Sequence, residues 1–359
     1  MIPAVAQRVK TQAARMVHGL GRLRSGARAG GVVLIYHRIA QPLADPWNIS
    51  VSPQTFADHM EILRRFAVPR TFGDFAGRLN AGDTEPGIAV TFDDGYADNL
   101  LALPILEAHD VPATIFVVSG AVGNPPAFWW DFLTTIFLET PRLPQQLLLE
   151  AGGKPVLYDL GEAAIYSPAD LSRSARWRAD LTPPQDKRQS VYLAVWQDLV
   201  GLEPDEILRA MDRLRAWAGL PEIPAQNDAR PVTQAELLRL ADSPLIEIGG
   251  HTRTHADLAR LSPEQAAGEI GGGRQDLMEM TGRDLRSFAY PYGRFGPRTI
   301  ADIRDGGYAW AGCSRHGFAT SRHDPSALPR VHATDLSADR FEAMLAGLMR
   351  PLRKRAASA

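Results

Sequence analysis

The 359-residue sequence contains a single cysteine, Cys313, so it can form neither an intramolecular disulfide nor a zinc site built from several cysteines. Any metal ion must therefore be held by histidine, aspartate or glutamate, and we expect Cys313 to be a small buried residue. No apolar run reaches about 18 residues, so no membrane-spanning helix is predicted. Neither charge dominates, with 39 Lys and Arg against 41 Asp and Glu, and the basic field typical of nucleic-acid binders is missing. We expect no nucleic-acid partner.

The two ends of the sequence are basic, although the chain as a whole is not. Residues 1–30, which we take as a separate N-terminal segment, carry basic but no acidic side chains, and residues 350–355 form a second basic cluster. Such ends suit an anionic membrane surface, but they are more often simply solvated. No apolar segment of about 7–15 residues with a cleavage site follows the first basic residues. We expect a cytoplasmic protein, with peripheral membrane association as an alternative, and the oligomeric state stays open.

Strand and helix patterns alternate along most of the chain, whose 45% hydrophobic and 22% charged residues are typical of a globular protein. Buried strands are predicted at Val32–Tyr36, Ile88–Phe92, Pro112–Val118, Leu245–Ile248, Ser287–Tyr290, Tyr308–Gly312 and Leu328–His332. Helix starts are predicted at Ser52, Ser262 and Ser337. Repeated alternation of this kind indicates parallel strands joined by helical crossovers. We predict an α/β fold, a distorted parallel (β/α) barrel of about seven strands.

The alternation is interrupted between residues 119 and 243. This stretch holds five of the seven tryptophans and several helical patterns, so we predict a mostly helical insertion over 119–243. The barrel is then formed by residues 31–118 and 244–350. Trp129 and Trp130 open the insertion and are candidates for stacking on a sugar ring, although core packing is the more common role of such a pair.

Polar residues gather after the C-terminal ends of the predicted strands. They are His37, Asp93, Asp94, His251, His255, Tyr292 and His332. In a parallel barrel these ends share one face, which is where the active sites of such barrels lie. We therefore expect these side chains to meet at one rim.

Two of these histidines have the spacing of metal ligands. His251 and His255 are four residues apart, so on a helical turn both imidazoles face one metal ion. The turn at Asp93-Asp94-Gly95 can supply a third ligand and leave the other carboxylate free as a base. Each motif alone also fits ordinary surface histidines or a turn without function, but their joint occurrence favours a metal site.

The same motifs resemble those of a known family. Thr91–Gly95 (TFDDG) and His251–His255 (HTRTH) are similar to the first two motifs of the polysaccharide deacetylases, which include the nodulation-type chitooligosaccharide deacetylases. Tyr290–Gly293 (YPYG) is similar to the third motif, and Val33–His37 and Leu328–His332 also fit the resemblance. The family fold is a distorted (β/α) barrel of about seven strands, in agreement with the alternation described above.

The resemblance implies hydrolysis of an N-acetyl group on an amino sugar, or of an O-acetyl group on a glycan. It implies one divalent metal ion, with zinc expected, held by Asp94, His251 and His255. It also implies that Asp93 is the general base and that the backbone N–H of Tyr292 stabilises the oxyanion. His332 matches the histidine that protonates the leaving amine, although a rim histidine without a chemical role is the alternative.

The sequence departs from the family pattern at Ala289, where the third motif normally carries an arginine oriented on the catalytic aspartate. Loss of an arginine near a carboxylate removes one influence that keeps its pKa low. Arg253 and Arg294 are candidates to replace it, and Arg294 and His37 are also candidates for substrate binding at the rim. The family's fourth motif is not recognisable.

We therefore expect a metal-dependent deacetylase whose partner is an acetylated saccharide, either an amino-sugar glycan or a lipid-linked saccharide. A binding module that keeps metal and glycan without turnover is one alternative, which Ala289 favours and the presence of Asp93 disfavours. A glycosidase that uses Asp93 and Asp94 is another. Its two carboxylates would have to flank the scissile bond, about 5–9.5 Å apart, and would need no histidine pair, so we disfavour it.

Overall fold

The structure is a computed structural model of the chain that describes residues 30–123, 128–220 and 229–356. The predicted basic segment 1–30 lies outside this part except for its last residue, as do the basic side chains of 350–355. Within the described residues the chain divides into two compact units. The barrel unit comprises 30–41, 50–123 and 229–356, and the insertion unit comprises 42–49 and 128–220. No helix among the described residues has the length and apolar character needed to cross a membrane.

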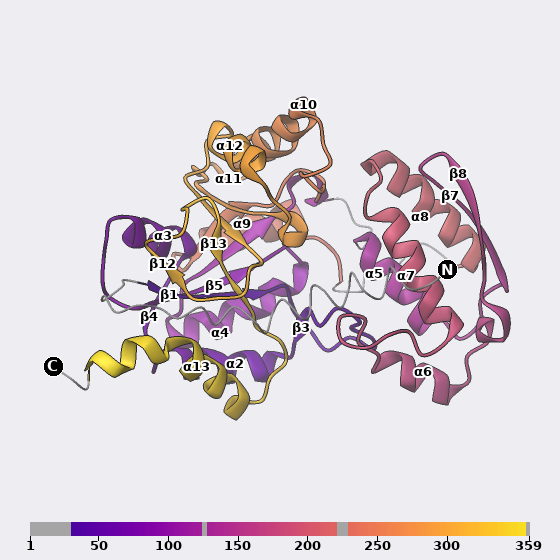
Figure 1. Cartoon of the computed structure of the whole chain (residues 1–359), viewed down its shortest axis with the longest axis horizontal. Coiled ribbons are helices and arrows are strands. Elements are labelled where there is room, and N and C mark those ends of the chain that lie inside the picture. The colour runs from indigo at the N-terminus through magenta and orange to yellow at the C-terminus, as the bar shows by residue number, and fades with distance from the viewer. Residues whose placement is uncertain (1–29, 124–127, 221–228, 357–359) are drawn as a thin grey trace. The chain divides into compact units, whose positions relative to one another are not determined.

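The barrel unit is built on one nearly closed, almost wholly parallel sheet (Figure 1). Its strands are β1 (Gly30–Tyr36), β4 (Val68–Arg70), β5 (Gly87–Phe92), β6 (Ala113–Val117), β9 (Ile246–Gly250), β10 (Ser287–Ala289), β11 (Trp310–Cys313), β12 (Ala319–Thr320), β13 (Leu328–Pro329) and β14 (Val331–His332). The order is β12-β1-β5-β6-β9-β10-β11-β13, with β14 beside β1 and β4 beside β5. Among the described strand pairs of this sheet, only β1 and β12 are antiparallel. Two further short strands, β2 (Arg38–Ile39) and β3 (Ser50–Val51), pair with each other. The predicted (β/α) barrel is confirmed.

The barrel closes where the chain changes its pairing partner. Leu328 of β13 pairs with Gly312 of β11, whereas Val331 of β14 pairs with Leu34 of β1. Arg330 is the residue between these two strands. The segment from β13 to β14 therefore bridges the first and the last long strands of the sheet, and we call it the seam.

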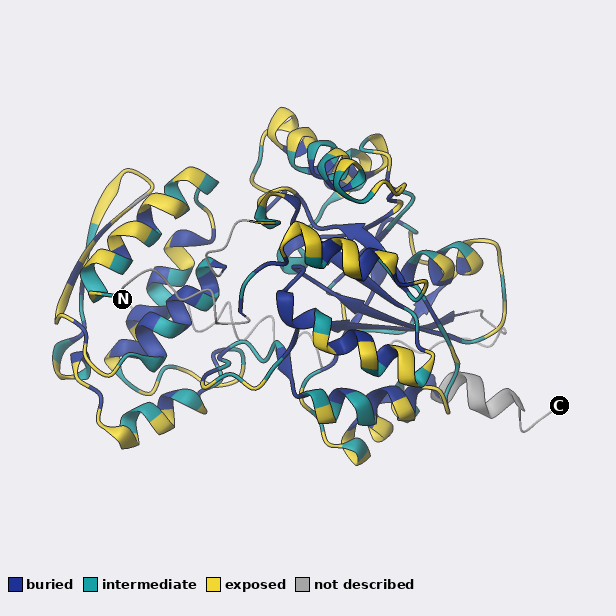
Figure 2. Cartoon of the chain, turned by 180° about the vertical axis from the view of Figure 1, so that it is seen from behind, coloured by how far each residue is buried: buried dark blue, intermediate teal, exposed yellow. Residues whose placement is uncertain are grey.

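Helices and short helical turns connect the strands of the barrel unit. They are α2 (Pro53–Leu63), α3 (Phe72–Asn80), η1 (Ala97–Leu101), α4 (Ala102–His109), η2 (Ser119–Ala121), α9 (Gln234–Asp242), α10 (Pro263–Ala267), η5 (Gly268–Gly272), α11 (Gly273–Thr281), η6 (Pro291–Gly293), α12 (Pro297–Asp305) and α13 (Ala338–Ala356). Helices α13 and α4 both pack against α2, while α10 and α12 pack together in a second group (Figure 1). Their inner faces are buried and their outer faces exposed (Figure 2).

Local sequence signals set the predicted helix starts. The Ser52 side chain accepts the N–H of Thr55 at the start of α2, and Pro53 occupies the first helical position. Ser262 forms a capping box with Gln265 at the start of α10. These contacts satisfy backbone donors that the first turn of a helix leaves without an intrahelical partner.

Small residues in the sheet make room for large ones inside the barrel. Gly249 of β9 is paired with Phe116 of β6, and a Cβ added there would lie 2.6 Å from the Phe116 ring and 2.8 Å from the Ser287 carbonyl oxygen. Ala289 of β10 belongs to the same buried cluster as Phe116 and is paired with Gly312 of β11. The interior below the rim is thus filled by side chains from only some of the strands.

The insertion unit is mostly helical, as predicted. Its elements are α5 (Trp129–Thr134), the π-helical turn η3 (Thr135–Glu139), β7 (Gln146–Ala151), β8 (Lys154–Asp159), η4 (Gly161–Ala164), α6 (Pro168–Ala175), α7 (Lys187–Leu199) and α8 (Pro204–Ala218). The hairpin β7–β8 was not expected. Gly152 and Gly153 form its turn with φ of 59° and 72°, and a Gly-Gly pair between two apolar runs is a recognised hairpin signal.

Replacing Gly249 by alanine tests the interior packing. The added methyl meets the Phe116 ring and a backbone carbonyl, so we expect Gly249→Ala to lower the free energy of unfolding by about 1–3 kcal/mol. The control is Gly347→Ala in α13, where an added Cβ meets nothing within 4 Å. That change should raise stability by up to about 1 kcal/mol, because glycine disfavours a helix interior. Urea denaturation measures both, and equal effects would contradict the packing described.

Candidate active site

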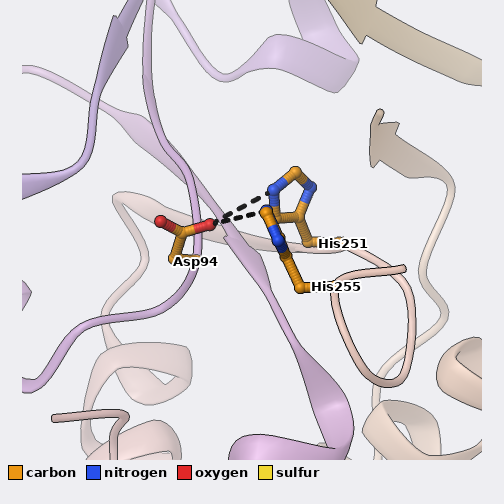
Figure 3. Close-up of side chains that lie close together, drawn as sticks. All are labelled: Asp94, His251 and His255. Atoms are coloured by element: carbon orange, nitrogen blue, oxygen red, sulfur yellow. Dashed lines mark ion pairs between the residues drawn. The ribbon is translucent and has the colours of Figure 1, made fainter. Parts of the chain in front are cut away.

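Three predicted ligands meet at the C-terminal rim of the barrel. Asp94 follows β5, whereas His251 follows β9 and His255 lies four residues further on. The Asp94 Oδ1 atom is 3.3 Å from Nε2 of His251 and 3.3 Å from Nε2 of His255 (Figure 3). One donor atom from each residue lies within 4.8 Å of the other two. Asp94 and His251 are buried and His255 is nearly so.

The loop that carries the two histidines is not the predicted helical turn. Thr252 and His255 have φ of 63° and 61°, and Asp94 has φ of 75° on the opposite side of the site. Non-glycine residues in this left-handed region cost about 1–3 kcal/mol each and persist only where the surroundings enforce them. This irregular backbone, rather than helical periodicity, brings both imidazoles to Asp94.

Two acidic side chains anchor this loop. Glu269 of η5 accepts the backbone N–H groups of Arg253 and Thr254, each at 2.9 Å, and also the Thr254 hydroxyl at 2.8 Å. Asp276 of α11 forms a bidentate pair with the Arg253 guanidinium at 2.7 and 2.6 Å. The sequence analysis did not identify Glu269 or Asp276, because neither belongs to a motif.

The donor set of Asp94, His251 and His255 fits a divalent metal ion. Nδ1 of His251 lies 2.8 Å from the Ala289 carbonyl oxygen, so this nitrogen carries the proton and Nε2 presents its lone pair to the site. Burial lowers the pKa of His255 to about 3, which keeps its imidazole neutral. Burial would raise the pKa of Asp94, but the nearby imidazoles, His251 first among them, hold it below its usual value. The carboxylates of Asp94 and Asp93 raise the pKa of His251 against the effect of burial. One carboxylate and two imidazoles are ligands that Zn²⁺ accepts.

Asp93 points to a different partner. Its two carboxylate oxygens accept hydrogen bonds from the two terminal nitrogens of Arg330, at 2.7 and 2.8 Å. Asp93 is 5% exposed and Arg330 is fully buried. Burial alone would raise the pKa of Asp93, but Arg330 and, to a smaller extent, His251 hold it well below its usual range. Asp93 is therefore ionised.

The arginines considered from the sequence as replacements near Asp93 bind other carboxylates. Arg253 pairs with Asp276, as described, and Arg294 pairs with Asp257 at 2.5 Å. Neither of these two candidates takes the place left by Ala289. Arg330 occupies this place instead. It lies in the segment Leu328–His332, in which the sequence pattern singled out only His332.

The remaining candidates of the barrel unit lie around the same rim. Tyr292 has φ of 56°, and its ring centroid lies 4.6 Å from that of His255. The rings of His37 and His332 are stacked with centroids 5.9 Å apart. Desolvation, followed by the nearby His37 and Arg330, lowers the pKa of His332, although its side chain is exposed at the rim. The Arg294 guanidinium carbon lies 5.7 Å from the Tyr292 ring centroid.

The two tryptophans belong to the insertion unit. Trp130 is 8% exposed and stacks on Phe128 with centroids 4.7 Å apart. Trp129 is partly exposed and meets the Trp130 ring edge-to-face at 5.5 Å. Trp130 thus packs within the unit, and Trp129 leaves part of its surface accessible. In the barrel unit, Cys313 is buried, as expected.

Comparisons with known proteins point to one family. Residues 80–139 and 206–311 match the family model described as polysaccharide deacetylase. A segment of 96 residues, 26% of this chain, is 29% identical to YxkH of Bacillus subtilis, which is named as a polysaccharide deacetylase. The segment spans 33% of YxkH, so the match covers about a third of that protein.

Solved structures share the fold. A polysaccharide deacetylase from Bacillus cereus has a TM-score of 0.55 at 16% identity, over 89% of this chain and 69% of that chain. The deacetylase PplD of Streptococcus pyogenes has a TM-score of 0.50 at 16% identity, over 89% and 99% of the two chains. IcaB of Ammonifex degensii has a TM-score of 0.50 at 19% identity, over 88% and 97%. At these identities the likeness establishes the fold.

Neutralising the loop anchor tests the metal site without touching a ligand. In Glu269→Gln the carboxylate that accepts two backbone N–H groups is lost, so we expect zinc affinity to fall about 10–100-fold. Competition titration against a chromogenic chelator measures it. Glu264→Gln, an equal charge change at an exposed position of α10, should leave the affinity unchanged, and His255→Ala should abolish tight binding. Wild-type affinity in Glu269→Gln would show that the loop holds its shape unaided.

Proposed function

We propose that the protein is a metal-dependent hydrolase of the polysaccharide deacetylase family, whose model matches residues 80–139 and 206–311, and that it removes acetyl groups from an amino-sugar glycan or a lipid-linked saccharide. N-acetyl groups are the proposed target, so the bond cleaved is a C–N bond other than a peptide bond. The observation that carries the proposal is the pairing of an ionised, buried carboxylate, Asp93, with an adjacent set of metal-binding donors.

The metal site supplies the first part of the chemistry. Asp94, His251 and His255 would hold one divalent ion, and zinc suits their oxygen and nitrogen donors. Such an ion, when bound, polarises a carbonyl group and lowers the pKa of water. All three side chains come from segments that follow strand ends on one face of the barrel, the face where active sites of such barrels lie.

Asp93 is the proposed general base. Its carboxylate, ionised beside Arg330, accepts a proton from the attacking water. A carboxylate with a strongly lowered pKa is a weak base. Asp93 would therefore contribute to proton transfer through its fixed position next to Asp94, and through the greater acidity of a water molecule in the site. The backbone N–H of Tyr292 would donate to the acetyl oxygen as that oxygen gains negative charge, and such a donor contributes about 3 kcal/mol.

His332 is the proposed acid that protonates the leaving amine. Its pKa lies below the usual value, so it enters the reaction neutral and must gain a proton before it can give one. We propose that His332 receives the proton that Asp93 has taken from the attacking water and passes it to the amine. His37, stacked on His332, and Arg294 would contact the saccharide at the rim.

The two alternatives receive less support. Ala289 favours a binding module without turnover, but Arg330 supplies Asp93 with a guanidinium from the seam. A glycosidase needs two carboxylates on opposite sides of a scissile bond, whereas Asp94 faces two imidazoles. Neither alternative accounts for the two distinct surroundings of the adjacent aspartates.

Replacing Asp93 by asparagine separates base from metal ligand. Asp93→Asn should bind zinc with wild-type affinity, because Asp94, His251 and His255 are intact, and should release acetate about a hundredfold more slowly. Enzymatic assay of acetate from a panel of N- and O-acetylated oligosaccharides measures the rate. Asp324→Asn, which breaks an Arg304 pair away from the rim, is the control and should retain the rate. A wild-type protein that releases no acetate from any member of the panel would refute the proposed function.

A further inference from the structure

The interior of the barrel just below Asp93 is lined by unusually small residues. Ala289 of β10 and Gly312 of β11 are paired in register, so their Cα positions lie side by side on one face of the sheet. Gly249 of β9 belongs to the neighbouring strand and also faces inward, toward Phe116. The family's third motif places an arginine at position 289, but the methyl group of Ala289 can reach no carboxylate.

Arg330 fills this space from the seam. Its Nη1 donates to Asp93 at 2.7 Å and to the Thr91 hydroxyl at 3.1 Å, and its Nη2 donates to Asp93 at 2.8 Å. Its Nε donates to the Cys313 carbonyl oxygen at 3.4 Å. The guanidinium carbon also lies 5.4 Å from the Phe116 ring centroid. All three nitrogens of a fully buried cation thus have acceptors, which burial of a charge requires.

Gly312 is the residue that admits this side chain. A Cβ at position 312 would lie 2.7 Å from Cδ and 2.8 Å from Nε of Arg330. The Arg330 stem therefore passes directly over the Gly312 backbone, beside the small Ala289. Arg330, Gly312 and Ala289 fit together as one arrangement, in which the seam supplies the guanidinium that β10 lacks.

We propose that Arg330 is the positioning residue of Asp93, and that it acts from the seam in place of an arginine at position 289. Two parallel N–H···O bonds fix both the place and the plane of the carboxylate, which a lysine ammonium cannot do. The proposal rests on the proposed function, since it concerns the base of that reaction. It also means that the residue between β13 and β14 serves both barrel closure and orientation of the base.

Arg330→Lys tests this role, because it keeps the positive charge and removes the bidentate geometry. We expect a folded protein with wild-type zinc affinity, a KM within about twofold and a kcat lowered about 10–100-fold, as misplacement of a reacting group by about 1 Å produces. The probe is the N-acetylglucosamine tetramer, or the panel member that wild type deacetylates fastest. The control, Arg70→Lys, alters a buried arginine paired with Asp74 and Glu85 away from the rim, and should retain kcat.

A double-mutant cycle distinguishes positioning from a purely structural role. If Arg330 acts through Asp93, then adding Arg330→Lys to Asp93→Asn lowers kcat no further. If Arg330 only closes the barrel, the two losses multiply, or Arg330→Lys lowers the melting temperature and leaves the kcat of the folded fraction unchanged. Either of these results overturns the proposal.

A second variant covers the case in which Arg330→Lys fails to fold. Gly312→Ala displaces the guanidinium but removes no charge, so kcat should fall while zinc affinity stays at the wild-type level. Gly347→Ala is its matched control. Wild-type kcat in Gly312→Ala overturns the role of Arg330 and leaves the proposed function intact. Failure of wild type itself to release acetate overturns both, so the two failures are distinguishable.

Discussion

The buried ion pair of Asp93 and Arg330 is the interaction on which the barrel and its rim depend. Removing each charge from water costs several kcal/mol, which only good geometry and further hydrogen bonds offset. The pair meets this condition, since both carboxylate oxygens are bound and the remaining guanidinium donors reach Thr91 and Cys313. Loss of one partner would leave the other charged and unpaired, at a cost of about 3–5 kcal/mol. The seam and β5 are therefore tied together by a contact that is expensive to break.

Two adjacent aspartates acquire different properties from their surroundings. Asp93 faces the Arg330 guanidinium inside the barrel. Asp94, whose backbone has a φ of 75°, faces two imidazoles at the rim. One negative charge is matched within the protein, and the other is available to a cation from outside. Residues that lie next to each other in sequence can thus serve proton transfer and metal binding without exchanging roles, because their partners come from different strands.

The sequence predicted the strands, the barrel and the meeting of Asp94, His251 and His255, because these follow from local patterns and from the topology of parallel strands. It could not predict Arg330 as the partner of Asp93, since the two are 237 positions apart. The apolar pattern of Leu328–His332 also resembles a single strand. Only the change of pairing from β11 to β1 shows that it is two short strands with an arginine between them.

The backbone of the loop that carries His251 and His255 also could not be predicted from the sequence. A spacing of four residues predicts a helical turn, but the backbone at Thr252 and His255 is left-handed, which side-chain spacing does not encode. Glu269 and Asp276, which lie 14 or more positions after His255, hold the loop in that shape. Each half of the site therefore has its own distant anchor: Arg330 for the base, and Glu269 with Asp276 for the histidines. Among the described residues, the hydrogen-bond partners of Arg330 differ from those of Glu269 and Asp276. The position of the base and the affinity for metal can therefore vary independently.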